Sequence, residues 1–401
     1  MDKAGRWGDT CDRSDLQARV MIVGAPPTLV RFAVLLTLVC GGLLWAPAQA
    51  SAAGERGIGR ILAGRGEAPE SASQERKELM TWYGRQMKRH WAKFEARIGE
   101  PLNQWARAHV PEVKGGVVFY PFGGPDFVTV HRVFPKADRY VLIALQKGGR
   151  APRLHEATDY RLGQVLRLFE EGIKEFAQRG FFLTKEMNRL FDWDTTVEGM
   201  TGIIAAFAEL EGFDILKVEP IRVHPETGFV ETHPGDHSHR KRWGSVRLYL
   251  QSRAEGRTVI IDYIRMNLYD EYLRKIPGQV RLVERMALYP TFLKAASHLL
   301  QQDGFASVRE ALLDNATLVV QDESGLGYTD LLKHFDVKLF GRFTLTNKLF
   351  RGVKGWRELA KAFKDQPPAL TVDFPIGYKK PAGSCLMVAK RKAESPLPGS
   401  P

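Results

Sequence analysis

Hydrophobic positions along this chain follow two spacings, one typical of amphipathic helices and one typical of strands. Between 159 and 179, Leu162, Val165, Phe169 and Phe176 recur at the three- and four-residue spacing that lines one face of a helix. Elsewhere, short apolar runs are bounded by Gly, Pro and charged residues, which is typical of strands. The pattern predicts helices at 75–110 (two helices divided by Pro101), 159–179, 196–211, 279–288, 291–302, 306–315 and 356–363. It predicts strands at 117–122, 140–146, 213–223, 245–251, 257–268, 318–321, 337–343 and 385–389.

The interleaving of these elements predicts the fold class. Helices and strands alternate along the chain, which favours an α/β or mixed α+β fold around a mixed sheet, with a helical N-terminal segment. The domain organisation expected is a precursor segment at 1–52, a flexible leader at 53–74, an N-terminal half of the α/β domain at 75–223, a His-rich loop at 224–243, a C-terminal half at 244–392 and a disordered tail at 393–401.

The apolar run near the N-terminus has the form of a secretory signal. Arg31 precedes the run 32–44, and small residues follow at Ala48, Ala50 and Ala52, where signal peptidase would cleave. A transmembrane anchor would need about 20 apolar residues, so no membrane-spanning segment is expected after processing. A signal normally begins close to its charged region, so Met21, ten residues before Arg31, is expected to be the true start. We therefore expect a protein that is exported to the periplasm or the extracellular space.

Charge and cysteine content narrow the expected partners. The chain has 58 Lys and Arg against 46 Asp and Glu, a net charge of +12, and only Cys385 of its three cysteines lies beyond the precursor segment. No intramolecular disulfide is therefore expected in the mature chain. For an exported basic protein, anionic envelope polymers are more plausible partners than nucleic acid, although the same charge is also typical of an ordinary solvated surface.

Common catalytic signatures are missing from the sequence. It contains no GxSxG, HExxH, GxxxxGK[ST] or paired CxxC motif, and no GxGxxG follows a predicted strand. No cofactor is therefore expected, and the catalytic residues are not identified by motif.

The first candidate site is the stretch YPFGGPDF at 120–127. Gly123 and Gly124 would let the backbone approach a ligand, and Asp126 would project from the carboxyl end of a strand, where open α/β sheets bind ligands. The alternative is a plain helix start, with Asp126 complementing the helix dipole.

The second candidate is the turn after the predicted strand 318–321. It carries Asp322, Glu323 and Ser324. If this strand end converges with the first, Asp126 and Asp322, or Glu323 in its place, would form a carboxylate pair suited to acid and base chemistry on a glycosidic or ester bond. The alternative is a polar turn with side-chain caps.

Two further stretches have weaker signals. Thr184 and Lys185 in FFLTKEM could pair with an anionic ligand, although Thr184 also has the character of a helix N-cap. His233, His237 and His239 are dense enough for a divalent metal, but a solvated basic loop is favoured because no regular element would position the ligands.

Four stretches carry a family resemblance. YPFGGPD, FFLTKEM, FLKAASHLL at 292–300 and QDESG resemble a group of bacterial exported proteins of unassigned function. The resemblance covers about 91–391 and implies no particular activity, and the His-rich loop is not part of it.

Three functions remain open from the sequence. The first is an exported protein that binds a polar ligand or envelope component at Asp126, Lys185 and Asp322. The second is a hydrolase of an envelope glycan or ester that uses the carboxylate pair. The third is a basic scaffold that binds anionic envelope polymers.

Overall fold

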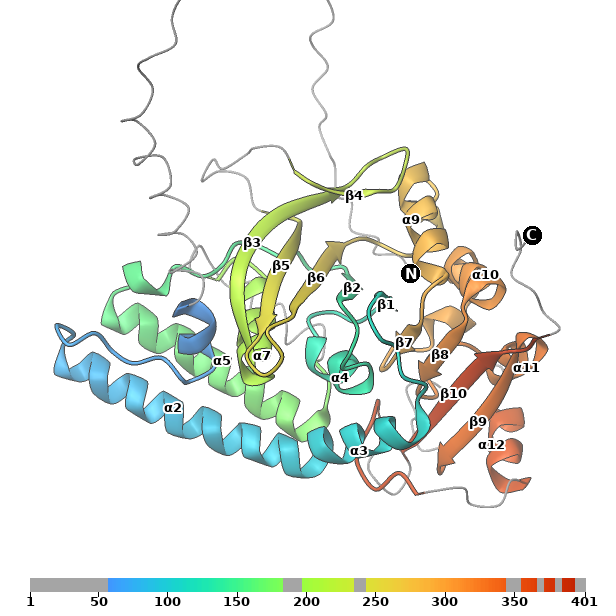
Figure 1. Cartoon of the computed structure of the whole chain (residues 1–401), viewed down its shortest axis with the longest axis horizontal. Helices are drawn as coiled ribbons and strands as arrows, with labels where there is room; N and C mark the ends of the chain where they lie inside the picture. Colours follow the sequence, from blue (N-terminus) through green and yellow to red (C-terminus); the bar gives the residue numbers. More distant parts are fainter. Residues whose placement is uncertain are drawn as a thin grey trace, which may run out of the picture. The chain divides into compact units, whose positions relative to one another are not determined.

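A single ten-stranded sheet runs through the part of the chain that the structure describes (Figure 1). The structure is a computed structural model, and it describes residues 57–182, 197–233, 243–343, 355–365, 371–378 and 384–393. The strand order is β4-β3-β5-β6-β2-β1-β7-β8-β10-β9. The fold is therefore α/β with a mixed sheet, which confirms the predicted class.

The centre of the sheet is parallel. Its strands, in sheet order, are β6 (Thr258–Arg265), β2 (Arg139–Ala144), β1 (Val117–Tyr120), β7 (Thr291–Leu293) and β8 (Leu318–Gln321). Both faces of these strands are buried, which explains why their sequences are nearly continuous apolar runs. Because all five strands are parallel, their carboxyl ends meet at one edge of the sheet.

Antiparallel strands extend the sheet on both sides. On one side lie β5 (Ser245–Ser252), β3 (Phe213–Val223) and β4 (Val230–Thr232), and on the other lie β10 (Cys385–Arg391) and β9 (Phe335–Gly341). The short link between β5 and β6 gives the antiparallel pair that the sequence predicts.

Helices cover both faces of the sheet. One layer contains α2 (Gln74–Phe94), α3 (Glu100–His109), α4 (Phe127–Val133), α5 (Asp159–Arg179) and α7 (Thr201–Leu210). The other contains α8 (Asp270–Leu273), α9 (Pro277–Ala287), α10 (Ala306–Asn315), α11 (Tyr328–His334) and α12 (Trp356–Asp365). Alternate strand residues face the two layers: Tyr140 and Leu142 pack in the first core, and Val141 and Ile143 in the second.

The connections give the parallel strands the order of a doubly wound sheet. Numbered along the chain, the five strands lie in the order 3-2-1-4-5, which is the order of nucleotide-binding doubly wound folds. Helix α4 connects β1 to β2 in the first layer, whereas α9 and α10 precede and follow β7 in the second. The winding therefore changes direction between β1 and β7, and such switch points are where these sheets bind ligands.

Three expectations from the sequence need correction. The helix predicted at 291–302 is wrong: Thr291–Leu293 form β7, and the apolar spacing that follows belongs to an irregular loop and a single 3₁₀ turn, Leu299–Gln301. Residues 57–62 of the predicted flexible leader are helical, and Ile58 and Leu62 are buried in the core. Residues 230–232 of the predicted His-rich loop form the short strand β4.

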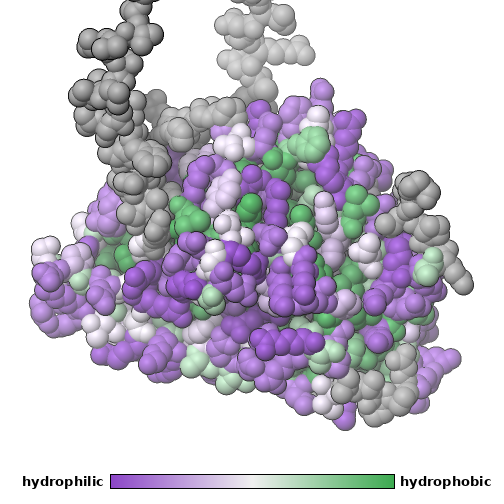
Figure 2. Space-filling view, viewed as in Figure 1, coloured by the Kyte–Doolittle hydropathy of each residue, from purple (hydrophilic) through white to green (hydrophobic). Residues whose placement is uncertain are grey.

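The described surface is mainly polar. Figure 2 shows hydrophilic side chains over most of one face of the molecule. None of the helices in the described ranges is both long and apolar enough to cross a membrane.

Candidate functional site at the carboxyl ends of the parallel strands

The loop after β1 is organised by a buried aspartate. The Asp126 carboxylate caps α4 by accepting a hydrogen bond from the Thr129 N–H at 3.2 Å, so the predicted helix start is present. The Thr129 hydroxyl also donates to this carboxylate, and the Tyr120 hydroxyl lies 3.3 Å from it. Burial, followed by the nearby negative charge of Asp126, raises the pKa of Tyr120 well above its ordinary value.

A buried lysine connects this loop to the end of β7. The Lys294 Nζ lies 2.5 Å from Asp126 Oδ2, and the two residues are 2% and 4% exposed. The same ammonium group donates to the Thr129 hydroxyl at 3.0 Å and to the carbonyl oxygen of Gly180, the C-cap of α5. A cation is favourable at this helix end because the last carbonyls of α5 carry partial negative charge. The ion pair therefore joins β1, β7 and α5.

The acidic turn after β8 holds the loop after β7 through the backbone. Asp322 accepts a hydrogen bond from the Ala295 N–H at 2.9 Å, and Ser324 Oγ accepts one from the Ala296 N–H at 2.7 Å. The Ser324 N–H and hydroxyl donate in turn to Asp322 at 2.8 and 2.5 Å. Complete burial raises the pKa of Asp322, and its hydrogen bonds oppose that shift. This turn is therefore a support for the neighbouring loop.

The backbone at this edge is strained. Phe122, Ala295, Ser297 and His298 have φ values of 63°, 51°, 54° and 55°, and they are the non-glycine residues with positive φ within the described ranges. Each such residue costs on the order of 1–3 kcal/mol and persists only where its surroundings impose it. All four lie in the loops after β1 and β7, so the strain is concentrated at the switch point.

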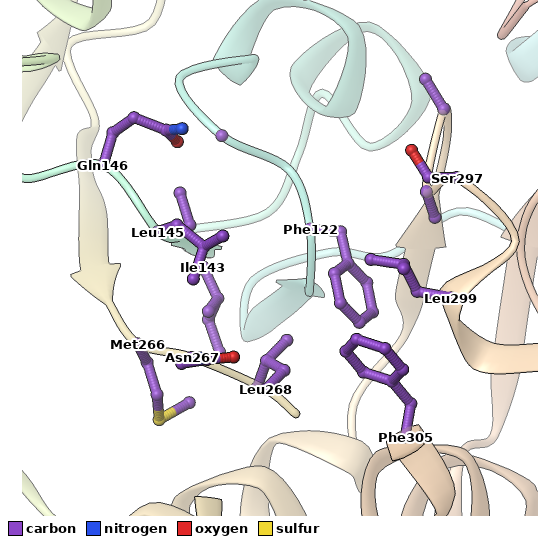
Figure 3. Close-up of a pocket in the computed structure, with 14 residues that line it drawn as sticks. Phe122, Ile143, Leu145, Gln146, Met266, Asn267, Leu268, Ser297, Leu299 and Phe305 are labelled. Carbon is purple, nitrogen blue, oxygen red and sulfur yellow. The ribbon is translucent and has the colours of Figure 1, made fainter. Parts of the chain in front are cut away.

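A pocket of about 160 Å³ opens at the same place. Figure 3 shows the rings of Phe122 and Phe305 next to each other, with Leu299 and Leu268 on either side of them. The ring centroids of Phe122 and Phe305 are 5.7 Å apart. The apolar lining comes from the end of β2, from the loops after β1, β6 and β7, and from the residue before α10: Ile143, Phe122, Met266, Leu268, Leu299 and Phe305. The pocket therefore lies outside the carboxyl ends of four parallel strands.

Three polar side chains line the pocket. Gln146 follows β2, Asn267 follows β6 and Ser297 follows β7. Asn267 Oδ1 accepts the Tyr269 N–H at 3.0 Å, which orients the side-chain NH₂ of Asn267 as a donor. An apolar pocket with a few convergent polar groups is typical of a small-molecule site.

The structure brings several of the predicted residues together. Asp126, Asp322 and Ser324 lie in the loops after β1 and β8, and both loops contact the loop after β7. Gly124 lines the pocket, whereas Gly123 packs against the ring of Tyr120. Glu323 is buried, with its Oε2 3.5 Å from Cys385 Sγ.

The structure does not place the remaining predicted residues in this site. Thr184, Lys185, His237, His239 and the secretory signal lie outside the described residues. His233 is described and exposed, and within the described ranges no group of three or more His, Cys, Asp or Glu side chains could hold a metal ion.

The sequence analysis does not identify the three polar residues of the pocket or Lys294 beside it. Gln146, Asn267, Ser297 and Lys294 each lie shortly after a strand, in no recognisable motif. The available signal was positional: in a parallel sheet, polar residues directly after the strands lie at the ligand-binding edge.

Comparisons with protein-family models, with curated proteins and with solved structures find no match to this chain. The function is therefore inferred from the geometry of the site.

Proposed function

We propose that the protein binds a small ligand with a flat ring system, of the nucleoside class, in the pocket lined by Phe122 and Phe305. The observation that carries this proposal is the position of the pocket at the switch point of a sheet ordered 3-2-1-4-5. Doubly wound sheets of this order bind nucleotide ligands there. The sequence predicted a polar ligand. Because the pocket is mainly apolar with three polar side chains, we propose an amphipathic ligand in its place.

The size and lining of the pocket support a single ring system. A cavity of about 150 Å³ accepts a benzene-sized ring, so a pocket of about 160 Å³ holds one flat group while the rest of the ligand lies at the mouth. Gln146 lies 22 residues after Gly124. At about this separation, dinucleotide-binding folds place the acidic residue that binds ribose hydroxyls. The Gln146 amide can accept the same hydrogen bonds without a charge.

The N-terminus of α4 argues against a ligand phosphate at the position that dinucleotide-binding folds use. In dinucleotide-binding folds the pyrophosphate lies at the N-terminus of the helix after the first strand. Here Asp126 occupies that position and its carboxylate already caps α4. We therefore expect a ligand that carries no phosphate there.

The hydrolase alternative has less support. The Asp126 carboxylate is paired with Lys294, and Asp322 is engaged by the backbone of Ala295 and by Ser324. Neither aspartate lines the pocket. The scaffold alternative rests on the net charge of +12 and would be supported by polyanion binding that weakens steeply with salt.

We also propose export, on the evidence of the signal-like segment at 31–52. Cell fractionation with N-terminal sequencing tests this. A mature N-terminus near Ala50 or Ala52 would support it, and an unprocessed chain in the cytoplasm would contradict it.

The binding proposal is tested by calorimetric titration of the purified protein with adenosine, guanosine, uridine, S-adenosylmethionine, AMP and NAD. At least one ligand without phosphate is expected to bind, and AMP is expected to bind about tenfold more weakly than adenosine, a difference of about 1.4 kcal/mol. Asn267→Asp keeps the oxygen that accepts the Tyr269 N–H and removes the NH₂ donor, so it should weaken binding without unfolding the protein.

A matched control is Gln251→Ala, because Gln251 is an exposed amide on β5 away from the pocket. Equal loss in both variants, or no binding of any nucleoside by the wild type, would contradict the proposal.

A further inference from the structure

Ser297 combines a position in the lining of the pocket with a strained backbone. It lies four residues after β7, is half-buried, lines the pocket and has a φ of 54°. A serine on a strained turn after a strand resembles the arrangement of a nucleophile in some hydrolases. The hydrogen-bond partner of Ser297 determines whether its hydroxyl can act as a nucleophile.

The partner is the hydroxyl of Tyr378, 2.7 Å from Ser297 Oγ. The Tyr378 hydroxyl donates its single proton to the carbonyl oxygen of Ala295 at 2.6 Å. The bond between the two hydroxyls must then run from Ser297 to Tyr378. Burial raises the pKa of Tyr378 to about 12, so the phenol stays protonated at neutral pH and cannot activate Ser297 as a base would.

This direction leaves Ser297 with acceptor capacity only. A serine hydroxyl has one proton and two lone pairs, and here the proton is committed to Tyr378. We infer that Ser297 is a specificity-determining residue that accepts a hydrogen bond from the ligand, so that the pocket selects ligands with an N–H or O–H donor at this position. This inference shares one premise with the proposed function, namely that the pocket binds a ligand, and it does not require that the ligand is a nucleoside.

Two isosteric fragments test the inference independently of the nucleoside class. Indole carries an N–H donor, whereas benzofuran has an acceptor oxygen in the same place. Dissociation constants of both fragments, measured by ligand-observed NMR with the full chain, should show indole binding about fivefold more tightly to the wild type, as expected for one hydrogen bond of about 1 kcal/mol.

Two variants separate the role of Ser297 from a general effect on the pocket. Ser297→Ala should bind the two fragments equally, because the acceptor is gone. Tyr378→Phe should also reduce the difference in affinity between the two fragments. In this variant benzofuran should bind more tightly, because the hydroxyl proton of Ser297 is no longer donated to Tyr378 and can be donated to the benzofuran oxygen. Melting temperatures show whether either variant is simply unfolded, and Ser297→Cys, which keeps a weak acceptor, provides a second replacement.

The outcomes distinguish this inference from the proposed function. Selection of indole that disappears in Ser297→Ala supports it, even if no nucleoside binds and the proposed class fails. Equal binding of both fragments by the wild type, or selection that persists in Ser297→Ala, overturns it even if adenosine binds. If neither fragment binds, the inference is overturned, and the titration with adenosine alone decides the proposed function.

Discussion

Asp126 Oδ2 and Lys294 Nζ lie 2.5 Å apart in the interior of the protein, at the ends of neighbouring parallel strands. The two residues come from stretches separated by more than 160 positions in the sequence. Their ion pair fixes the loops after β1 and β7, and these loops form one wall of the pocket. The aspartate that the sequence singled out is thus a support for the site.

The first prediction concerns this pair. Asp126→Asn should lower the free energy of unfolding by about 3–5 kcal/mol, because removing one partner leaves a buried charge without compensation. Asparagine is as good an N-cap as aspartate, so the loss reports the charge and not the capping of α4. Urea denaturation measures it.

Two further variants control this result. The double variant Asp126→Asn, Lys294→Met should recover part of the loss, since no buried charge then remains. Glu271→Gln removes the exposed partner of Lys275 and should change stability little. A small effect of Asp126→Asn, similar to that of Glu271→Gln, would show that the buried pair does not support the fold.

The second prediction concerns backbone strain. Ala295→Gly should leave stability unchanged or raise it by about 1 kcal/mol, because glycine adopts the φ of 51° without steric cost. The two hydrogen bonds of Ala295, to Asp322 and from Tyr378, use backbone atoms and are retained.

The adjacent alanine is the control for strain. Ala296 does not have a positive φ, so Ala296→Gly should lower stability by about 0.5–1 kcal/mol. Thermal unfolding of the two variants side by side makes the comparison, and a larger loss for Ala295→Gly than for Ala296→Gly would rule out strain at Ala295.

The third prediction is a pH dependence. His131 on α4 stacks on Phe127 and lies 3.0 Å from the hydroxyl of Tyr140, which donates to the carbonyl oxygen of Phe134. Burial, followed by the positive charges of Arg132 and Arg257, lowers the pKa of His131 to about 3. The unfolded chain takes up a proton near pH 6.5 and the folded protein does not. The stability that neutral His131 provides is therefore full above pH 6.5 and is lost as the pH falls from 6.5 toward 3.

Chemical denaturation at pH 7, 5.5 and 4.5 checks this dependence. His131→Phe keeps the aromatic stacking but cannot titrate, so its stability should fall less than that of the wild type over this range. His155, whose side chain is 64% exposed, provides the control, and His155→Gln should follow the wild type. Parallel curves for the wild type and His131→Phe would contradict a neutral His131 in the folded protein.

Regular elements were predictable where one spacing held over a whole segment. Helix α5 begins and ends where predicted, since Thr158 caps its start and Gly180 ends it with a φ of 75°. Strands β3 and β8 also match their predicted bounds. Such segments carry their structural signal locally.

The site was less predictable because its geometry depends on strand order. The apolar spacing of FLKAASHLL favoured a helix, but Phe292 pairs with Val320 of β8 inside the sheet. The loop that follows takes its positive φ values from hydrogen bonds to Asp322 and Ser324 in another stretch. Neither contact can be read from local composition, and the role of Ser297 depends on Tyr378, 81 residues further along the chain.

The most direct test of the account is the affinity of the purified protein for adenosine, measured by calorimetry beside Asn267→Asp and Gln251→Ala. We predict saturable binding to the wild type and to Gln251→Ala, weakened in Asn267→Asp and weaker for AMP than for adenosine. Absence of binding by adenosine and the other nucleoside-class ligands, or binding unaffected by Asn267→Asp, would contradict a nucleoside site at the switch point of this sheet.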